Sequence, residues 1–119
     1  MAYIANNPAG YDKQVVGNGH CVVFVQTCTC APQARMWKEG AKVKGALTLQ
    51  TGTAIATFKN GVYPNNASGN HAAIYMSQDA MGIWVYDQWI GQPVHKRLIR
   101  FKGGVGSAVD DGDAYSVIE

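Results

Sequence analysis

The sequence predicts an α+β domain in which a short helix near the N-terminus packs on an antiparallel sheet of about five or six strands. Three observations favour this class. The chain has 119 residues and is 47% hydrophobic, which suits one compact core and is too short for two. A glycine-containing loop leads into an apolar segment at Cys21, and strand-like segments follow one another from Thr53 onward. We therefore treat residues 1–119 as a single domain.

The apolar segment that begins at Cys21 is expected to form a helix to about residue 28. Composition alone leaves a buried strand open, because residues 22–25 are Val, Val, Phe and Val. In a helix, Cys21 would lie in the first turn, where unpaired N–H groups and the helix dipole favour a thiolate. The amide of Cys21 would then point to the place where an oxyanion forms. Cys21 is therefore the candidate nucleophile.

The segment after this helix has a weaker pattern. Pro32 interrupts the chain, and residues 33–37 are expected to form a short helix or turn that ends at Gly40. Trp37 is expected to be a core anchor. Residues 38–52 contain three glycines and little periodicity, so we expect mostly loop there.

The C-terminal half carries five segments that are typical of strands, at residues 53–58, 71–77, 83–89, 94–101 and 114–118. Strands joined in succession by short turns predict an antiparallel meander. Residues 60–70 form a long loop rich in glycine and asparagine. Residues 103–106 lack the Lys-Ser/Thr of a phosphate loop, and residues 110–113 lack the last acidic residue of a calcium loop, so we expect a flexible connection and a solvated turn.

Charge and hydropathy exclude several classes of partner. The formal net charge is +2 and the basic residues are scattered, so nucleic-acid binding is not indicated. No apolar run approaches the roughly 20 residues that a membrane span requires. The N-terminus has neither the basic nor the apolar region of a Sec signal peptide. We expect a protein made in the cytoplasm that either stays there or leaves by a route that reads no such signal.

Three cysteines leave at least one thiol unpaired. Cys28 and Cys30 are expected to be reduced packing residues. A strained bridge between them is one alternative. A zinc site that combines them with His20 and Cys21 is another, although structural zinc usually draws on a second, separated ligand pair and none follows downstream.

A cysteine nucleophile needs a base, and the chain has three histidines. His20 adjoins Cys21, so on a helix the two side chains diverge. His95 alternates with Lys96 and Arg97 on what is expected to be a solvated strand. His71 opens an apolar strand and is followed by two alanines, which leave room beside it. His71 is therefore the candidate base, against the alternative of a structural hydrogen bond at a strand end.

Asp87 is the candidate third residue. A hairpin whose turn is centred on Asp79 would place His71 directly opposite Asp87, close enough for the carboxylate to orient the imidazole. Val85 and Trp89 on the same face indicate that Asp87 is partly buried. A register that slips by one residue would instead offer Gln88 or Gln92.

Four segments of this chain together resemble the NlpC/P60 and CHAP group of papain-like cysteine peptidases, over about residues 11–101. They are Gly-His-Cys-Val at 19–22, the strand at 52–58, Asn-His-Ala-Ala-Ile-Tyr at 70–75 and Tyr-Asp-Gln-Trp at 86–89. Within the group, the chain looks like a type VI secretion amidase effector, and it is most similar to the third family of such effectors.

The resemblance implies a papain-like core with a helix-mounted Cys21 as nucleophile, His71 as base and Asp87 as third polar residue. It implies hydrolysis of an amide bond in the stems or crosslinks of Gram-negative peptidoglycan, with the D-Ala–diaminopimelate crosslink favoured over D-Glu–diaminopimelate. It also implies delivery by the secretion apparatus into a rival's periplasm and a cognate immunity protein. No metal or organic cofactor is required. A phage lysin, a wall remodeller or a non-catalytic interaction domain with an inert Cys21 are the alternatives.

Aromatic residues and the long loop are the candidate walls of a cleft. The loop at 60–70 and the side chains of Tyr11, Trp84 and Trp89 are expected to contribute, although an aromatic residue on a strand is more often part of a core.

Overall fold

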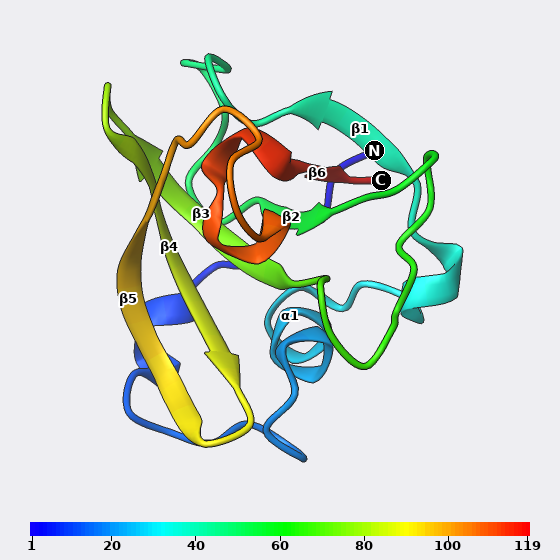
Figure 1. Ribbon diagram of the computed structural model, residues 1–119. Helices are drawn as coiled ribbons and strands as arrows, with labels where there is room; N and C mark the ends of the chain where they lie inside the picture. Colours follow the sequence, from blue (N-terminus) through cyan, green and yellow to red (C-terminus); the bar gives the residue numbers. More distant parts are fainter.

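The structure is a computed structural model that describes all residues 1–119, and it contains one α-helix and a six-stranded antiparallel sheet (Figure 1). The helix α1 spans Cys21–Thr29. The strands are β1 (Glu39–Lys42), β2 (Ala54–Thr57), β3 (Ala72–Gln78), β4 (Gly82–Trp89), β5 (Gln92–Arg100) and β6 (Tyr115–Ile118). Four short 3₁₀ helices complete the fold, at Pro8–Tyr11 (η1), Ala34–Met36 (η2), Ala108–Asp110 (η3) and Gly112–Ala114 (η4). The predicted α+β class and the helix that begins at Cys21 are confirmed.

Burial explains why a segment with strand-like composition becomes helical. Phe24 and Val25 are completely buried in a core that α1 shares with the sheet, and packing of this kind outweighs intrinsic propensity. The helix ends at Cys30, which adopts a left-handed conformation (φ 60°), and the hydroxyl of Thr29 donates to the carbonyl of Val25. Trp37 is 2% exposed and donates its indole N–H to the carbonyl of Pro32, which confirms its role as a core anchor.

Both faces of the sheet are covered, because successive residues of a strand point to opposite sides. Ala54 and Ala56 of β2 belong to the core on the α1 side, whereas Ile55 belongs to a second core on the other side. In β3, Ala72 and Ile74 pack on the α1 side in the same way. The short alanine side chains leave space for the helix to lie close to the sheet.

The sheet order is β1-β6-β2-β3-β4-β5, so the expected meander is confirmed only for β2 to β5. The last strand, β6, inserts between β1 and β2. The expectation of loop throughout residues 38–52 is wrong, since Glu39–Lys42 forms the edge strand β1. This strand is mostly exposed and pairs irregularly with β6, so it carries no alternating pattern by which the sequence could reveal it.

The segment between β5 and β6 is tied together by Asp111, which is 1% exposed. Its carboxylate accepts hydrogen bonds from the backbone N–H groups of Lys102, Gly104 and Asp113. The turn at residues 110–113 is therefore not simply solvated, as the sequence suggested, because a buried carboxylate joins it to the glycine-rich connection before it. Its neighbour Asp110 remains exposed at the end of η3.

The longest regular helix, α1, has nine residues, and no helix of the structure combines the length and the apolar character that crossing a bilayer requires. The two termini lie close together beside β1 and β6 (Figure 1), where the terminal ammonium of Met1 is 3.5 Å from a carboxylate oxygen of Glu119.

Candidate active site

Cys21 is the first residue of α1, with His20 as the capping residue in an extended conformation. The loop before it turns at Gly17 and Gly19, which have φ angles of 56° and 87°. A side chain at Gly17 would also collide with Val23, since an added Cβ would lie 2.5 Å from its Cγ1. Glycine at this position therefore allows the loop to pass close to the first turn of the helix.

Gln88 holds this loop in place. Its side-chain oxygen accepts from the backbone N–H of Val16, and its side-chain N–H groups donate to the carbonyls of Val16 and His20, each at 2.9 Å. Gln88 is completely buried, so these three bonds satisfy its amide. The sequence offered Gln88 as a substitute partner for His71, but the structure gives it this different task. Gln92, the other substitute, donates to the carbonyl of Pro93.

His71 lies immediately before β3 and is 6% exposed. Its backbone is fixed by Thr57, whose hydroxyl accepts from the N–H of His71 and whose N–H donates to the carbonyl of His71, both at 3.0 Å. The ring Nε2 is 2.7 Å from Oδ2 of Asp87. Since Nε2 is engaged by Asp87, Nδ1 is the ring nitrogen left for Cys21.

The register behind the His71–Asp87 contact differs from the expected one. Ile74 pairs with Tyr86, whereas a turn centred on Asp79 would have paired it with Trp84. Continued to the start of β3, the observed register places Trp89 opposite His71 and Asp87 two residues away on the same face. A shift of two residues preserves the face, so the carboxylate reaches the ring diagonally. The predicted contact is present, although the predicted pairing is wrong.

Asp87 is completely buried and lies among three potential cations. Besides His71, the Nε of Arg97 donates to Oδ2 at 2.8 Å, and Nε2 of His95 lies 3.1 Å from Oδ1. Oδ1 of Asp87 and Nε2 of His95 are both buried, and neither atom has a hydrogen-bond partner. The burial expected for Asp87 is confirmed. The expectation of a solvated His95 is wrong, because cross-strand pairing brings it against Asp87 and under Trp89.

Tyr63 and Asn70 belong to the loop that the sequence indicated as a wall of the cleft, but their individual contacts near the thiol were not predicted. The hydroxyl of Tyr63 lies 3.9 Å from Sγ of Cys21 and accepts a 3.2 Å hydrogen bond from the side chain of Asn70. Tyr63 is 5% exposed and packs on Trp37, with ring centroids 5.0 Å apart. The only sequence signal for Tyr63 itself was that it is the single aromatic residue of the loop at 60–70.

The pKa values of the three predicted residues move in complementary directions. Burial alone would raise the pKa of Cys21, but the hydrogen bond and charge of His71 and the N–H of Ala72 lower it below its usual value. Burial would lower the pKa of His71, but the hydrogen bonds to Asp87 and Cys21 raise it to about 9. Burial likewise opposes ionisation of Asp87, yet His71 and Arg97 hold its pKa below the ordinary value. Both shifts favour the charged pair, a thiolate on Cys21 and an imidazolium on His71.

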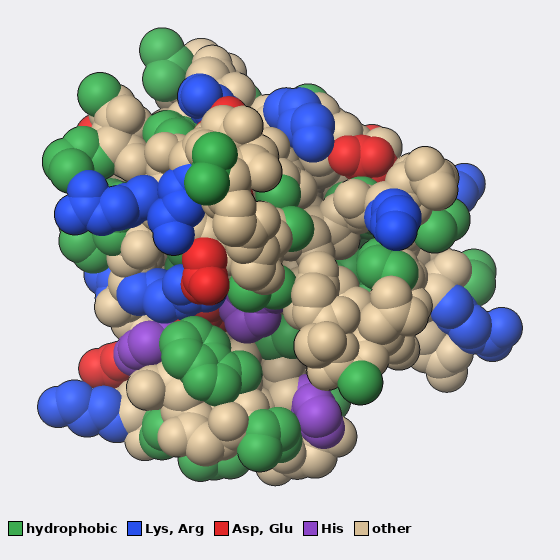
Figure 2. All heavy atoms as spheres, viewed as in Figure 1, with side chains coloured by type: hydrophobic (Ala, Val, Ile, Leu, Met, Phe, Trp, Pro, Cys, Tyr) green, Lys and Arg blue, Asp and Glu red, His purple; other side chains and the backbone are tan.

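A cleft of about 540 Å³ opens beside Cys21. It is lined by His20, Cys21, Val22, Tyr63, Asn65, Asn66, Ala67, Asn70, His71, Trp89 and Ile90. The long loop and Trp89 thus form walls, as predicted, whereas Trp84 and Tyr11 are not among the lining residues. On the face shown in Figure 2, histidine side chains lie around a hollow, and acidic and basic side chains touch at its edge.

A second cavity, of about 270 Å³, adjoins the first at Asn70, His71 and Trp89. Arg97, Val109 and Asp110 complete its lining. His71 lines both cavities, whereas Cys21 lines only the first and Arg97 only the second, and we refer to the two cavities together as the groove.

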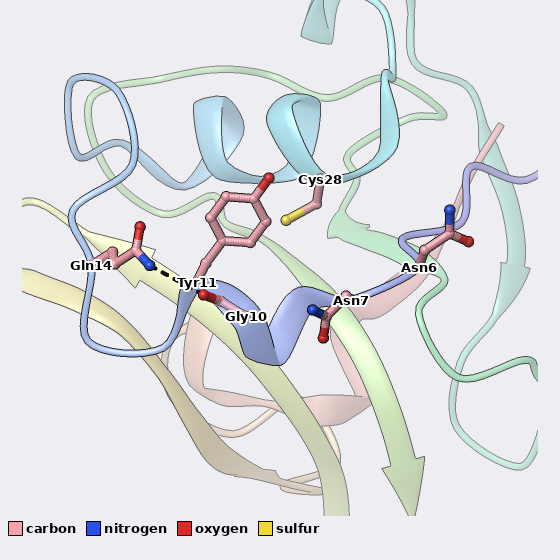
Figure 3. A pocket seen from close by; sticks show the side chains of 6 residues that line it. All are labelled: Asn6, Asn7, Gly10, Tyr11, Gln14 and Cys28. Carbon is pink, nitrogen blue, oxygen red and sulfur yellow. Dashed lines mark hydrogen bonds between the residues drawn. The ribbon is translucent and has the colours of Figure 1, made fainter.

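A separate cavity of about 360 Å³ lies beside the C-terminal part of α1 (Figure 3). Asn6, Asn7, Gly10, Tyr11, Gln14 and Cys28 line it, and none of the three predicted catalytic residues is among them. The ring of Tyr11 packs against Phe24, and Tyr11 therefore lines this separate cavity and not the cleft beside Cys21. Figure 3 shows the thiol of Cys28 directed toward the ring of Tyr11.

All three cysteines are free thiols, so the alternative of a bridge between Cys28 and Cys30 is not realised. Cys28 packs against the core, but Cys30 is exposed and the expectation that it packs is wrong. No group of three or more His, Cys, Asp or Glu residues is placed to hold a metal ion, which includes the zinc ligands considered from the sequence.

Known proteins resemble this chain over nearly its whole length. The family model described as domesticated amidase effector 2 matches residues 1–118. A Salmonella typhi protein named type VI secretion amidase effector 2 is 46% identical, with 100% of both chains covered. An Ixodes scapularis protein named domesticated amidase effector 2 is 43% identical over 70% of this chain and 56% of its own length.

A solved structure of type 6 secretion amidase effector 2 superposes with a TM-score of 0.86 at 39% identity, covering 98% of this chain and 94% of the other. These similarities confirm the resemblance to type VI secretion amidase effectors and the papain-like α+β fold. The matching proteins carry the number 2, so the second family replaces the third, which the sequence had favoured.

Proposed function

The chain belongs to the family of type VI secretion amidase effector 2 and domesticated amidase effector 2 proteins, and from this premise we propose that it is a peptidoglycan amidase that works as a cysteine peptidase. The observation that carries the proposal is the thiol at the start of α1, whose pKa is lowered by His71, itself hydrogen-bonded to buried Asp87. The catalytic residues are Cys21, His71 and Asp87, in one amidase domain formed by residues 1–119.

In the first step the Cys21 thiolate attacks the carbonyl carbon of a stem-peptide amide. The N–H of Cys21 and the neighbouring unpaired N–H groups of the first turn of α1 hold the developing oxyanion. His71, protonated in the resting ion pair, gives its proton to the leaving nitrogen, and the amine departs. The acyl group remains on sulfur as a thioester.

In the second step His71, now neutral, removes a proton from water, and the resulting nucleophile attacks the thioester. The thiolate leaves and the ion pair is restored. Asp87 keeps the ring of His71 oriented through both steps, because it accepts a hydrogen bond from Nε2 and so leaves Nδ1 for Cys21 and the substrate. The two reaction steps use only groups of the chain, the substrate and a water molecule, so no cofactor takes part.

The bond cut is the D-Ala–diaminopimelate crosslink, with the D-Glu–diaminopimelate bond as the alternative. The names of the relatives support a secreted effector, so we propose that the protein leaves by a type VI secretion apparatus and acts on the wall in the periplasm of a target cell. A cognate immunity protein would protect the producing cell by filling the cleft beside Cys21.

The test is incubation of purified Gram-negative sacculi with the wild type, Cys21→Ala and Cys28→Ala, followed by mass analysis of the released muropeptides. The two variants remove the same chemical group from the same helix. We expect the wild type and Cys28→Ala to deplete crosslinked dimers and Cys21→Ala to leave them intact. Shortened stems would move the cut to D-Glu–diaminopimelate, and identical profiles for all three would overturn the catalytic proposal.

A further inference from the structure

Arg97 makes a hydrogen bond to the buried carboxylate of Asp87 and also lines the groove. Its Nε donates to Asp87 at 2.8 Å, and the side chain is 20% exposed. The structure gives its terminal nitrogens no hydrogen bond. Nη1 lies 3.8 Å from Oδ1 of Asp110, which is an ion pair without a hydrogen bond.

The groove offers an anion one fixed positive charge. Among the residues that line its two cavities, Arg97 is the only lysine or arginine. The guanidinium lies over the ring of Trp89, 5.1 Å from the centroid, which restricts its position. A planar guanidinium held at a wall and retaining free N–H groups is well suited to bind a carboxylate.

The position of Arg97 relative to His71 identifies the side of the substrate that it meets. His71 gives its proton to the leaving nitrogen, so the leaving fragment lies on the His71 side of the scissile bond. Arg97 lines the cavity beyond His71, and Cys21 does not. An anion bound by Arg97 therefore belongs to the leaving fragment, close to the nitrogen that is released.

We propose that Arg97 binds the carboxylate on the carbon that carries the leaving nitrogen. This inference rests on the proposed amidase function and extends it to substrate choice. In a D-Ala–diaminopimelate crosslink, that carbon is the D-centre of diaminopimelate and carries a free carboxylate. In the D-Glu–diaminopimelate bond, the corresponding carbon is the L-centre, whose carboxyl group is already an amide in a tetrapeptide stem. A carboxylate site at Arg97 thus favours the crosslink.

The experiment compares two crosslinked tetrapeptide dimers that differ only at this carboxyl group, which is free in one and a primary amide in the other. The ratio of the two kcat/KM values is measured for the wild type and for Arg97→Gln. We expect the wild type to prefer the free acid on the order of tenfold to a hundredfold, and the preference to fall to near one in Arg97→Gln. A lost contact to Asp87 slows both substrates equally and leaves the ratio unchanged, which separates binding from positioning.

A binding measurement keeps the test decisive if Arg97→Gln turns over too slowly. Calorimetric titration of the same two dimers into Cys21→Ala and into Cys21→Ala/Arg97→Gln gives the preference without catalysis. Equal affinity of Cys21→Ala for the acid and the amide, or a preference that survives in the double variant, would overturn the assignment to Arg97. Failure of the wild type to cut either dimer would instead remove the proposed function itself.

Asp110 provides a second variant at the edge of the site. It is exposed and faces the same guanidinium, so a substrate carboxylate competes with it. Asp110→Asn should lower KM for the free acid about twofold to fivefold more than it changes KM for the amide, since an exposed ion pair is worth little. An equal change in both KM values would contradict the competition.

Discussion

Cys21 and Cys28 lie on the same nine-residue helix, about two turns apart, and both are half-buried. Their pKa values nevertheless move in opposite directions. Burial raises the pKa of Cys28 to about 12, whereas that of Cys21 is lowered. Burial disfavours both thiolates, so the difference comes from the groups around each sulfur.

The two sulfurs face different elements. Cys28 lines a cavity with neutral side chains such as Asn6 and Tyr11 and gains no partner for a negative charge. Cys21 receives the imidazolium of His71 and the N–H of Ala72 from β3, and the hydroxyl of Tyr63 from the long loop. The helix therefore supplies both thiols, and the groups from the sheet and the long loop lower the pKa of only one of them.

The largest expected effect is that of His71→Ala, which should make Cys21 resemble Cys28. Without the imidazolium, burial raises the pKa of the thiol, so alkylation at pH 7 should become slow. Amide hydrolysis should fall on the order of 10⁶-fold in kcat, as when the base of a nucleophile-base-orienter set is removed. Iodoacetamide labelling in a Cys30→Ser background, read by mass spectrometry, checks the first point. Fast labelling of Cys21 below pH 8 in this variant would refute the role of His71.

Asp87→Asn should produce a smaller loss, of roughly 10⁴-fold in kcat. The amide can present its N–H to Nε2 and so favour the tautomer with a proton on Nδ1, which turns the donor rather than the acceptor toward the sulfur. The pKa of His71 should fall because its main partner has lost its charge. NMR titration of the ring measures this shift. An unchanged His71 pKa would show that Asp87 does not set it.

The pH dependence of stability should reveal the ion pair of Cys21 and His71. The raised pKa of His71 stabilises the fold fully below 6.5, and this contribution is lost as the pH rises through about 9. The lowered pKa of Cys21 has the opposite sign, since its contribution is complete above 9.0 and is lost as the pH falls. Between pH 6.5 and 9 the two contributions oppose each other, so the free energy of unfolding of the wild type should change less than His71 alone would make it change.

Cys21→Ala removes the contribution of the thiol to the pH dependence of the free energy of unfolding. His71 remains paired with Asp87, so the variant should lose about 1–2 kcal/mol of stability as the pH rises across the same window. Urea denaturation at a series of pH values gives both curves. Parallel curves for the wild type and the variant would mean that the two groups do not form an ion pair.

Cys28→Ala should have the smallest effect and is the matched control for Cys21. Its half-buried thiol packs against the core without a hydrogen bond, so stability should fall by about 1 kcal/mol and kcat/KM should be unchanged. Thermal unfolding and hydrolysis assays test both statements. A large loss of activity would show that the cavity in Figure 3 communicates with the site.

The candidate residues could be predicted because chemistry limits the choice. Only one of three cysteines follows a glycine-containing loop, and only His71 among the histidines opens an apolar strand. Period-two alternation kept Asp87 on the same face as His71 even though the register was wrong by two residues. The side of the sheet to which a side chain points is a local property of its strand. The register between β3 and β4 depends instead on the length of the turn and on an irregularity between Tyr75 and Ser77.

Residues that act through distant contacts could not be predicted. Arg97 and His95 reach Asp87 only because β5 pairs with β4, and Gln88 reaches the loop before Cys21 across 72 positions of sequence to Val16. The edge strand β1 forms because β6 returns from the C-terminus to pair with it. None of these residues carries a local pattern that indicates its partner.

By itself, the sequence determined the α+β class, the position of the candidate nucleophile Cys21 at a helix start and the choice of His71 as its candidate base, since these depend on residue type, local periodicity and turn chemistry. Tertiary structure alone decided that the pKa of Cys21 is lowered, and it alone brought His71 and Arg97 to the lining of one cavity. The physical reason is that a pKa and a cavity depend on which groups from separate elements meet, and such contacts arise only when the sheet and the helix pack together.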